Sequence, residues 1–317
     1  MRNKIIFSLT IIALGIMVVS LGLLPGNRGE EQVGQVLGAR SEASELEMNL
    51  PSLGDLVSPP VKTNDYEPPI SVKAAILVDA KSAYPLYQEN ELEQVPIAST
   101  TKIMTAVIAL ENYNVEDEIT VSSDATSTIG SSINLRADEV ITVDSLLKGL
   151  LIQSGNDAAV TLAEKMGFDR FVSAMNSKAV ELGMVNTAYQ DPAGLNDEGY
   201  STAKDLSILA SYALRNTKIK DIVSTEEMTV FSTDGQISHE LKNSNRLIRK
   251  DNPLYLEGAF GLKTGYTPEA GHCLVSSAVR DDHQLISVVL NTSENTVEAS
   301  AKESRKLLSW GFETYKW

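Results

Sequence analysis

The chain has 317 residues and a formal net charge of −15, with 42 acidic residues against 27 lysines and arginines. This surplus of acid argues against binding to nucleic acid and against electrostatic adhesion to an anionic membrane. Cys273 is the one cysteine, so no disulfide can form within the chain. The three histidines are too dispersed to indicate a metal site or a serine–histidine pair, and we expect neither a metal nor a cofactor.

The N-terminus combines a basic start with a long apolar run. Arg2 and Lys4 precede an uncharged stretch at 5–24, which is long enough to cross a bilayer at about 20 residues. A signal-peptide core is shorter, at about 7–15 residues. We therefore favour an uncleaved anchor within residues 1–25, with cleavage near Gly38–Ala39 as the alternative, and we expect the rest of the chain to be exported.

Residues 26–70 are predicted to form a disordered linker, because they are polar, acidic and rich in proline with little apolar periodicity. The same composition fits a tether that reaches the cell wall and a spacer without further function, and both readings stay open. Residues 71–317 are numerous enough for one hydrophobic core and are predicted to form a single catalytic domain.

Apolar patterning within this domain predicts strands, then helices, then strands again. The expected elements are a hairpin at 72–79 and 84–88, a helical block from residue 100 to about 216, a strand at 228–231, strands at 273–279 and 285–290, and a closing helix at 297–312. This order predicts an α/β fold in which an antiparallel sheet from both ends of the domain carries an inserted helical lobe.

Ser99-Thr100-Thr101-Lys102 opens the first predicted helix. Side chains three residues apart share a helix face, so the Ser99 hydroxyl and the Lys102 amine lie within reach of each other. The pair can act as nucleophile and general base if the amine is neutral, which burial and a second cation, Lys263, would favour. The alternative is that Ser99 simply caps the helix.

A second Ser-x-x-Lys motif, from Ser201 to Lys204, also precedes a predicted helix. No suitably spaced partner motifs follow it. We therefore assign Ser201 to capping that helix.

Ser154-Gly155-Asn156 separates a helix predicted over 143–153 from one that begins at Asp157. The triplet is predicted to be a tight turn that presents polar groups from an apolar setting. Ser154 could pass a proton to a leaving amine, and Asn156 could hold a substrate amide and the Lys102 amine. A capped helix junction is the alternative, and the similar triplet at 132–134 is predicted to be a structural loop.

Lys263-Thr264-Gly265 lies at the start of a predicted antiparallel meander. An open strand edge can bind an extended peptide, and Gly265 permits a close approach. The charge of Lys263 and the hydroxyl of Thr264 suit a terminal carboxylate. The backbone N–H groups of Ser99 and Tyr266 could form an oxyanion hole. Taken alone, the triplet could equally place a surface lysine on a strand edge.

With three motifs in this order, the chain resembles the low-molecular-mass penicillin-binding proteins, and among them the D-alanyl-D-alanine carboxypeptidases. The resemblance runs from about Val72 to the C-terminus and implies a β-lactamase/DD-peptidase-like sandwich. Its segments are 98–106, 154–158, 191–195, 201–205, 243–247, 263–265 and 307–312.

The resemblance implies a serine acyl-transfer cycle on the stem peptides of bacterial peptidoglycan, outside the cytoplasm. A serine would attack the carbonyl between two D-alanines, free D-alanine would leave, and water would release the shortened peptide. β-Lactams would be covalent inhibitors. The implied roles are nucleophile for Ser99, general base for Lys102, proton transfer and substrate binding for Ser154 and Asn156, and carboxylate recognition for Lys263 and Thr264.

The sequence departs from the family pattern in three places. The sequence reads to Trp317, and we expect it to lack the small β-rich domain and the amphipathic helix that many members carry. The arginine that often follows the last strand is replaced by Asn291–Glu294, and Tyr266 stands where other members carry histidine.

Two other functions share these residues: a D,D-endopeptidase that cuts peptidoglycan crosslinks, and a catalytically silent wall-binding protein. A β-lactamase is disfavoured, because Gly155 replaces an aspartate and no Glu-x-x-Leu-Asn segment supplies a deacylating base.

Overall fold

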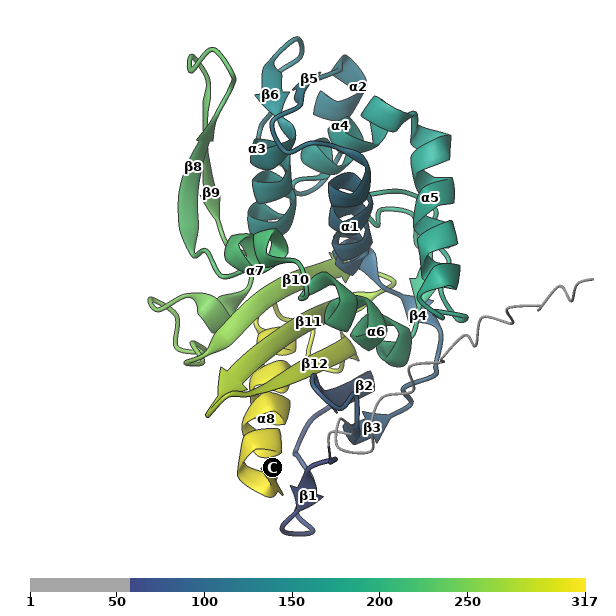
Figure 1. Ribbon diagram of the computed structural model, residues 1–317, viewed down its shortest axis with the longest axis vertical. Coiled ribbons are helices and arrows are strands. Elements are labelled where there is room, and N and C mark those ends of the chain that lie inside the picture. The colour runs from purple at the N-terminus through teal and green to yellow at the C-terminus, as the bar shows by residue number, and fades with distance from the viewer. Residues whose placement is uncertain (1–57) are drawn as a thin grey trace, which may run out of the picture. The chain divides into compact units, whose positions relative to one another are not determined.

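The computed structural model describes residues 58–317, and Figure 1 shows their arrangement. The anchor predicted within residues 1–25 lies outside the described residues, as does the predicted linker up to residue 57. Among residues 58–317, no helix combines the length and the apolar character that a membrane span requires.

The core of the domain is a five-stranded antiparallel sheet with the order β10-β11-β12-β2-β3. Its strands are β2 (Val72–Asp79), β3 (Pro85–Glu89), β10 (Ala259–Thr267), β11 (Gly271–Arg280) and β12 (His283–Thr292). The first hairpin and the C-terminal meander therefore meet in one sheet. This confirms the predicted α/β fold with a sheet built from both ends of the domain.

Both faces of this sheet are covered (Figure 1). Helix α8 (Ala299–Thr314) packs against one face and α6 (Ala203–Ala213) against the other. Alternate residues of β2 accordingly enter different cores, Ile76 with the helical lobe and Leu77 with α8. Since a strand that is buried on both sides needs apolar residues at nearly every position, β2 is a continuous apolar run.

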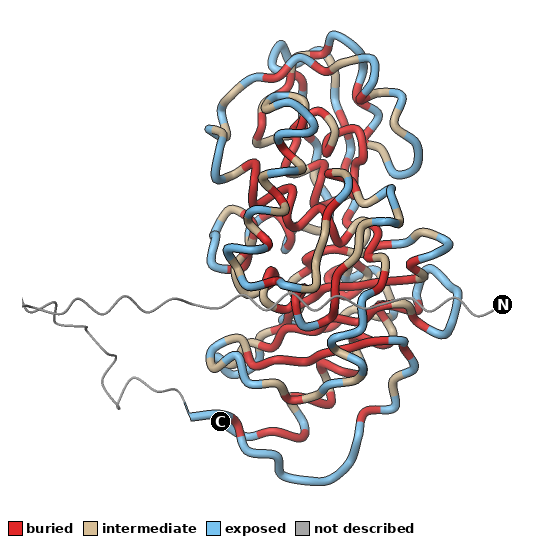
Figure 2. The backbone as a smooth tube through the Cα atoms, turned by 90° about the vertical axis from the view of Figure 1, so that its right-hand side faces the viewer, coloured by how far each residue is buried: buried red, intermediate tan, exposed pale blue. Residues whose placement is uncertain are grey.

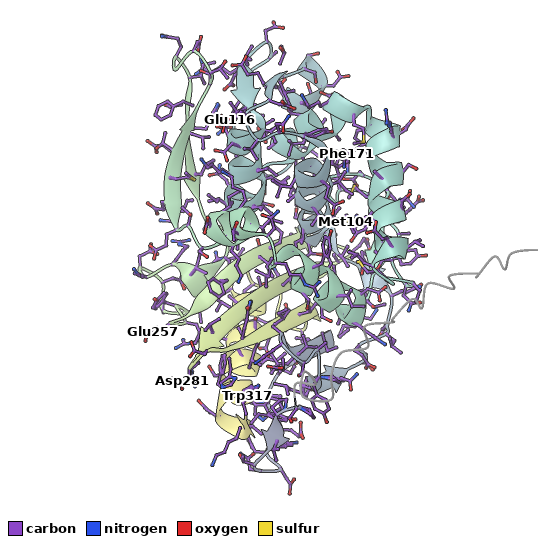
Figure 3. All side chains as sticks on the ribbon, viewed as in Figure 1. Met104, Glu116, Phe171, Glu257, Asp281 and Trp317 are labelled. Atoms are coloured by element: carbon purple, nitrogen blue, oxygen red, sulfur yellow. The ribbon has the colours of Figure 1, made fainter. Side chains whose placement is uncertain are left out.

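The inserted lobe is helical and lies beside the β10 end of the sheet. Its helices are α1 (Lys102–Asn112), α2 (Ser123–Thr126), α3 (Val143–Lys148), α4 (Asn156–Met166), α5 (Phe168–Glu181) and α7 (Thr217–Val223). Short strand pairs, β4 (Val95–Pro96) with β7 (Tyr200–Ser201) and β5 (Glu118–Thr120) with β6 (Val140–Thr142), connect them. Met104 and Phe171 are fully buried in the lobe (Figure 3), and buried backbone runs through both lobe and sheet (Figure 2).

The strand predicted near residue 228 exists, but it does not join the main sheet. Strands β8 (Glu227–Phe231) and β9 (Ser238–Lys242) pair only with each other among the described residues. Every second residue of this hairpin is exposed, and Phe231 remains 52% accessible. Such a one-sided pattern cannot occupy a sheet that is covered on both faces.

The folded unit begins before residue 71, where the linker was predicted to end. Strand β1 (Val61–Lys62) pairs with β13 (Tyr315–Lys316). Thr63 donates from its backbone N–H and from its hydroxyl to the carbonyl of Thr314, at 2.8 and 2.7 Å. The indole of Trp310 donates to the carbonyl of Tyr66 at 2.7 Å. Most of these side chains are exposed, so their composition resembles that of a linker although backbone hydrogen bonds hold them.

Candidate active site

Ser99 lies in a short 3-10 turn, η2 (Ala98–Thr101), which runs directly into α1. The 2.8 Å distance between Ser99 Oγ and Lys102 Nζ confirms that the two side chains meet across one turn. Neither η2 nor α1 has a side-chain hydrogen bond at its N-cap. The hydroxyl of Ser99 therefore faces an amine rather than capping the helix.

The amine of Lys102 makes two further contacts, with Asn156 Oδ1 at 2.7 Å and the carbonyl of Ala193 at 2.7 Å. Both of these oxygens can only accept hydrogen bonds. A neutral amine has two hydrogens and one lone pair. When the two hydrogens go to Asn156 and Ala193, the lone pair is left facing the Ser99 hydroxyl, which is the arrangement that proton abstraction from Ser99 requires.

Burial lowers the pKa of Lys102 to about 7, against the charges of Asp191 and Asp157, which act to raise it. The side chain is completely buried, so its charged form loses the stabilisation of water. A substantial fraction of Lys102 is therefore neutral at physiological pH, and such an amine can serve as a general base.

The turn at Ser154-Gly155-Asn156 follows an irregular helix. The helix predicted over 143–153 is α-helical only to Lys148, and a π-helical turn, η3 (Gly149–Gln153), replaces its last part. Ser154 then adopts a left-handed conformation with φ of 72°. π-Helical turns concentrate at functional sites, and this one ends the helix so that Ser154 lines a cleft together with Ser99.

Asn156 is held by the loop that precedes β6. Its backbone N–H donates to the carbonyl of Ser131 at 2.7 Å, and its Nδ2 donates to the carbonyl of Ile129 at 2.6 Å. With Nδ2 engaged in this way, Oδ1 must face Lys102. The triplet at 132–134 lies in this loop, which confirms the structural reading of it.

The loop is fixed in turn by Asp157, which the resemblance included in segment 154–158 without giving it a role. Its carboxylate accepts hydrogen bonds from the hydroxyl of Ser132 at 2.6 Å and from the backbone of Ile133 and Leu135, both at 3.1 Å. The one feature of the sequence that could have indicated this role is the position of Asp157 directly after Asn156.

Lys263, Thr264 and Gly265 lie on β10, an edge strand of the sheet. A bulge between Gly261 and Lys263 interrupts the register, so that Leu262 and Lys263 are both buried although they are neighbours in a strand. A Cβ at Gly265 would lie 3.0 Å from the carbonyl oxygen of Ile97 and 3.1 Å from the backbone nitrogen of Ser99. The close approach expected of Gly265 is therefore real, and it brings β10 against η2.

Burial lowers the pKa of Lys263 well below its usual value, and the nearby Lys102 lowers it further. The sequence suggested that Lys263 helps to lower the pKa of Lys102. Burial is the main cause of the lowered pKa of both residues, and the repulsion between the two amines adds to it. The amine of Lys263 donates to the carbonyl of Thr264 at 2.9 Å.

The three motifs surround one cleft of about 790 Å³ between the helical lobe and the edge of the sheet. Ser244 Oγ and Thr264 Oγ1, both lining this cleft, are 2.8 Å apart. The segment after β12, where no arginine is present, contributes Asn295. The remaining lining residues include Ser131, Gln153, Leu195, Arg246, Tyr266 and His272.

The turn that carries the carbonyl of Ala193 is organised by Asp191. One carboxylate oxygen accepts hydrogen bonds from the backbone of Ala193 and Gly194, and the other accepts from Leu195 and Asn196. A Cβ on Gly194 would lie 2.0 Å from the carbonyl oxygen of Ala98, so only glycine fits there. Segment 191–195 was part of the resemblance. The contact of the Ala193 carbonyl with Lys102 could not be predicted from it, because a backbone carbonyl is present in every residue type.

The second Ser-x-x-Lys motif lies away from this cleft. The cap of α6 is Thr202, whose hydroxyl accepts from the backbone of Asp205 at 3.0 Å. The prediction that Ser201 caps this helix is therefore wrong by one residue. Ser201 ends β7, and its hydroxyl bonds to that of Thr187 instead. Within residues 58–317, no three metal-ligating side chains gather into a site for a metal ion.

Residues 61–294 match the model of the D-alanyl-D-alanine carboxypeptidase family. The carboxypeptidase DacF of Bacillus subtilis is 37% identical to the chain over 253 residues, which cover 77% of the chain and 63% of that relative. A D-alanyl-D-alanine endopeptidase of Pseudomonas aeruginosa is 33% identical to the chain. The matched region covers 80% of the chain and 83% of the endopeptidase. The chain spans less than two thirds of DacF and of the Escherichia coli carboxypeptidase DacC, which is 35% identical.

The structure resembles the crystal structure of the DD-transpeptidase of Streptomyces K15, with a TM-score of 0.73 and 30% sequence identity. That match covers 78% of the chain and the whole of the Streptomyces protein. Because the family model spans most of the domain, and because the three motifs converge on one cleft, the chain belongs to the D-alanyl-D-alanine carboxypeptidase family.

Proposed function

We propose that this protein is a serine D-alanyl-D-alanine carboxypeptidase that removes the terminal D-alanine from peptidoglycan stem peptides through an acyl-enzyme on Ser99. The observation that carries the proposal is the 2.8 Å contact of Ser99 Oγ with the buried amine of Lys102, which also contacts the oxygens of Asn156 and Ala193. When this amine is neutral, those two acceptors leave its lone pair for the hydroxyl proton. Family membership supplies the substrate class.

Acylation begins when the neutral amine of Lys102 takes the hydroxyl proton of Ser99. The Ser99 oxygen then bonds to the carbonyl carbon between the two D-alanines, and the carbonyl oxygen becomes an oxyanion. The backbone N–H groups of Ser99 and Tyr266 stabilise this oxyanion. The close approach of β10 to η2 at Gly265 supports this assignment, because it brings the two segments that carry these N–H groups together.

The intermediate collapses when the C–N bond breaks and D-alanine leaves with a proton on its amine. Ser154, which lines the cleft with Ser99, would relay that proton from Lys102. A water molecule then attacks the ester and gives its proton to Lys102. The bond between the acyl carbon and the Ser99 oxygen breaks, which releases the shortened peptide, and Lys102 returns the proton to Ser99. No step requires a metal or a cofactor.

The edge of β10 is the proposed seat of the peptide. Antiparallel addition of an extended chain would satisfy the open edge and lay the scissile bond over Ser99. Asn156 would hold the substrate amide and Lys102, and Lys263, Thr264 and Gly265 would bind the terminal residue. A β-lactam would occupy the same place, acylate Ser99 and leave slowly.

A D,D-endopeptidase that uses the same residues remains the second candidate, because the Pseudomonas aeruginosa relative of that name is as similar as several of the carboxypeptidases. A silent wall-binding protein is the third. It is disfavoured because Ser99, Lys102 and Lys263 are present and arranged for chemistry.

We also propose that the domain acts in the bacterial envelope, outside the cytoplasm. The apolar run at 5–24 would anchor it, or would direct its secretion if cleaved. Fractionation of cells into membrane, cytoplasm and medium tests this location.

The reaction is tested by incubating the full chain with monomeric pentapeptide muropeptides and with crosslinked dimers, using Ser99→Ala as the control. We expect Ser99-dependent release of D-alanine from the monomers. Cleavage of dimers without release of D-alanine would favour the endopeptidase, and a lack of reaction with both would favour the silent protein.

A further inference from the structure

The lining of the active-site cleft has an unusual charge for so acidic a chain. Although the sequence contains 42 acidic residues, none of the carboxylates within residues 58–317 lines the cleft. Within residues 58–317, Arg246 is the only arginine or lysine that lines the cleft. Lys102 and Lys263 are buried beneath its surface. A cleft whose described lining carries one half-buried cation and no acid favours an anionic group in the ligand.

Burial disfavours the charged form of both lysines. Burial lowers the pKa of Lys102 to about 7 and lowers the pKa of Lys263 well below its usual value. His272, the remaining basic group of the lining, has its pKa lowered by burial, and the charge of Arg246 contributes to this. A guanidinium stays protonated throughout the physiological range, so Arg246 is the permanent charge of the cleft.

The position of Arg246 is fixed by its own segment. Arg246 begins the short turn η4 (Arg246–Ile248), and the side chain of Asn245 caps this turn. Two residues earlier, the backbone N–H of Ser244 donates to the carbonyl of Ile152 in the helical lobe, and its hydroxyl contacts that of Thr264 at 2.8 Å. The segment is therefore tied both to the lobe and to β10, next to the Thr264 hydroxyl.

The guanidinium has no acidic partner within the described protein. Arg249, three residues later, pairs with Asp251 at 3.0 Å, whereas no carboxylate in residues 58–317 pairs with Arg246. Arg246 is nevertheless half-buried, and a partly buried cation gains from an anion that replaces its lost water. Arginine also binds both oxygens of a carboxylate through two parallel hydrogen bonds.

We infer that Arg246, together with Thr264, binds the terminal carboxylate of the substrate and so gives the enzyme its requirement for a free C-terminus. This inference rests on the proposed function, because the carboxylate belongs to the D-alanine that leaves. Arg246 is thus a specificity-determining residue, which the sequence motifs did not indicate. Thr264 supplies a hydroxyl donor, and the charge of the pair comes from η4 rather than from the triplet on β10.

The test compares two peptides that differ only at the end: diacetyl-Lys-D-Ala-D-Ala and the same peptide with a C-terminal amide. Turnover is measured for the full chain in detergent and for Arg246→Gln, Arg246→Lys and Arg249→Gln. A lost charge-assisted contact corresponds to about 10- to 100-fold. We expect Arg246→Gln to lower kcat/KM for the carboxylate peptide by that factor, mainly through KM, and to change the amide peptide by less than about twofold.

Arg246→Lys should recover part of the loss, because it keeps the charge but not the paired hydrogen bonds. Arg249→Gln, which removes the same charge three residues away, should behave as wild type. Equal losses on both peptides, or no loss on either, would overturn the inference. The wild-type enzyme tests the proposed function separately: without turnover and without penicillin acylation of Ser99, the function fails first and the role of Arg246 fails with it.

Discussion

Lys102 can take the Ser99 proton only when its amine is neutral, so acylation of Ser99 should become faster as the pH rises through the pKa of Lys102. Burial lowers this pKa to about 7. The neutral fraction is then about 9% at pH 6, about 50% at pH 7 and about 91% at pH 8. The acylation rate should therefore rise about tenfold between pH 6 and pH 8 and level off above that.

An unperturbed lysine, with a pKa of about 10.4, would give a different curve. Its neutral fraction would grow tenfold with each pH unit up to about pH 10, without a plateau near pH 8. The presence and position of the plateau thus measure how far burial has lowered the pKa of Lys102.

The assay is the second-order rate constant for acylation by a fluorescent penicillin, measured by stopped flow between pH 5.5 and pH 9.5. The carboxylate of penicillin is ionised throughout this range, so any pH dependence belongs to the protein. Lys102→Met should abolish acylation. Lys204→Met, from the second Ser-x-x-Lys motif, should leave the curve unchanged. A rate that is independent of pH between 6 and 8, or that climbs to pH 10, would refute the role assigned to Lys102.

Three further predictions follow from individual contacts. Asp191→Asn removes a charge that raises the pKa of Lys102. The midpoint of the acylation rate against pH should therefore move below about 7. A midpoint that stays or rises would contradict the assignment of Lys102 as the general base. Gly265→Ala places a Cβ 3.1 Å from the backbone nitrogen of Ser99. This contact should displace β10 by a few tenths of an ångström and slow acylation by about tenfold. An unchanged rate would show that the close packing of β10 against η2 is not critical. A chain that starts at residue 71 loses strand β1 and the carbonyl that accepts from the Trp310 indole. Its free energy of unfolding, measured in urea, should be about 1–3 kcal/mol lower than that of a chain that starts at residue 58. Equal values would mean that residues 58–70 do not stabilise the domain.

The sequence predicted those parts of the site that depend on side-chain chemistry at fixed spacing. Ser99 and Lys102 are one helical turn apart, so their contact follows from periodicity alone. Asn156 and Lys263 could be assigned because short motifs carry them. The sheet from both ends of the domain was predictable because β2 near the start of the domain and β12 near its end each contain a long, mostly apolar run.

The parts that escaped prediction depend on backbone geometry or on tertiary neighbours. The carbonyl of Ala193 holds Lys102, but a backbone oxygen has no sequence signature. The π-helical turn before Ser154 has the same apolar pattern as an ordinary helix. Segment 243–247 was part of the resemblance, but a role for Arg246 became visible only when the fold placed η4 beside Thr264. The early start of the domain rests on backbone hydrogen bonds of exposed residues, which composition does not reveal.

The most direct test of the account is the intact mass of the protein after incubation with penicillin, for the wild type and for Ser99→Ala. We predict that the wild type gains the mass of one penicilloyl group, that peptide mapping places this group on Ser99, and that Ser99→Ala gains nothing. An adduct that persists in Ser99→Ala, or a wild type that stays unmodified at pH 8, would contradict the assignment of Ser99 as the nucleophile.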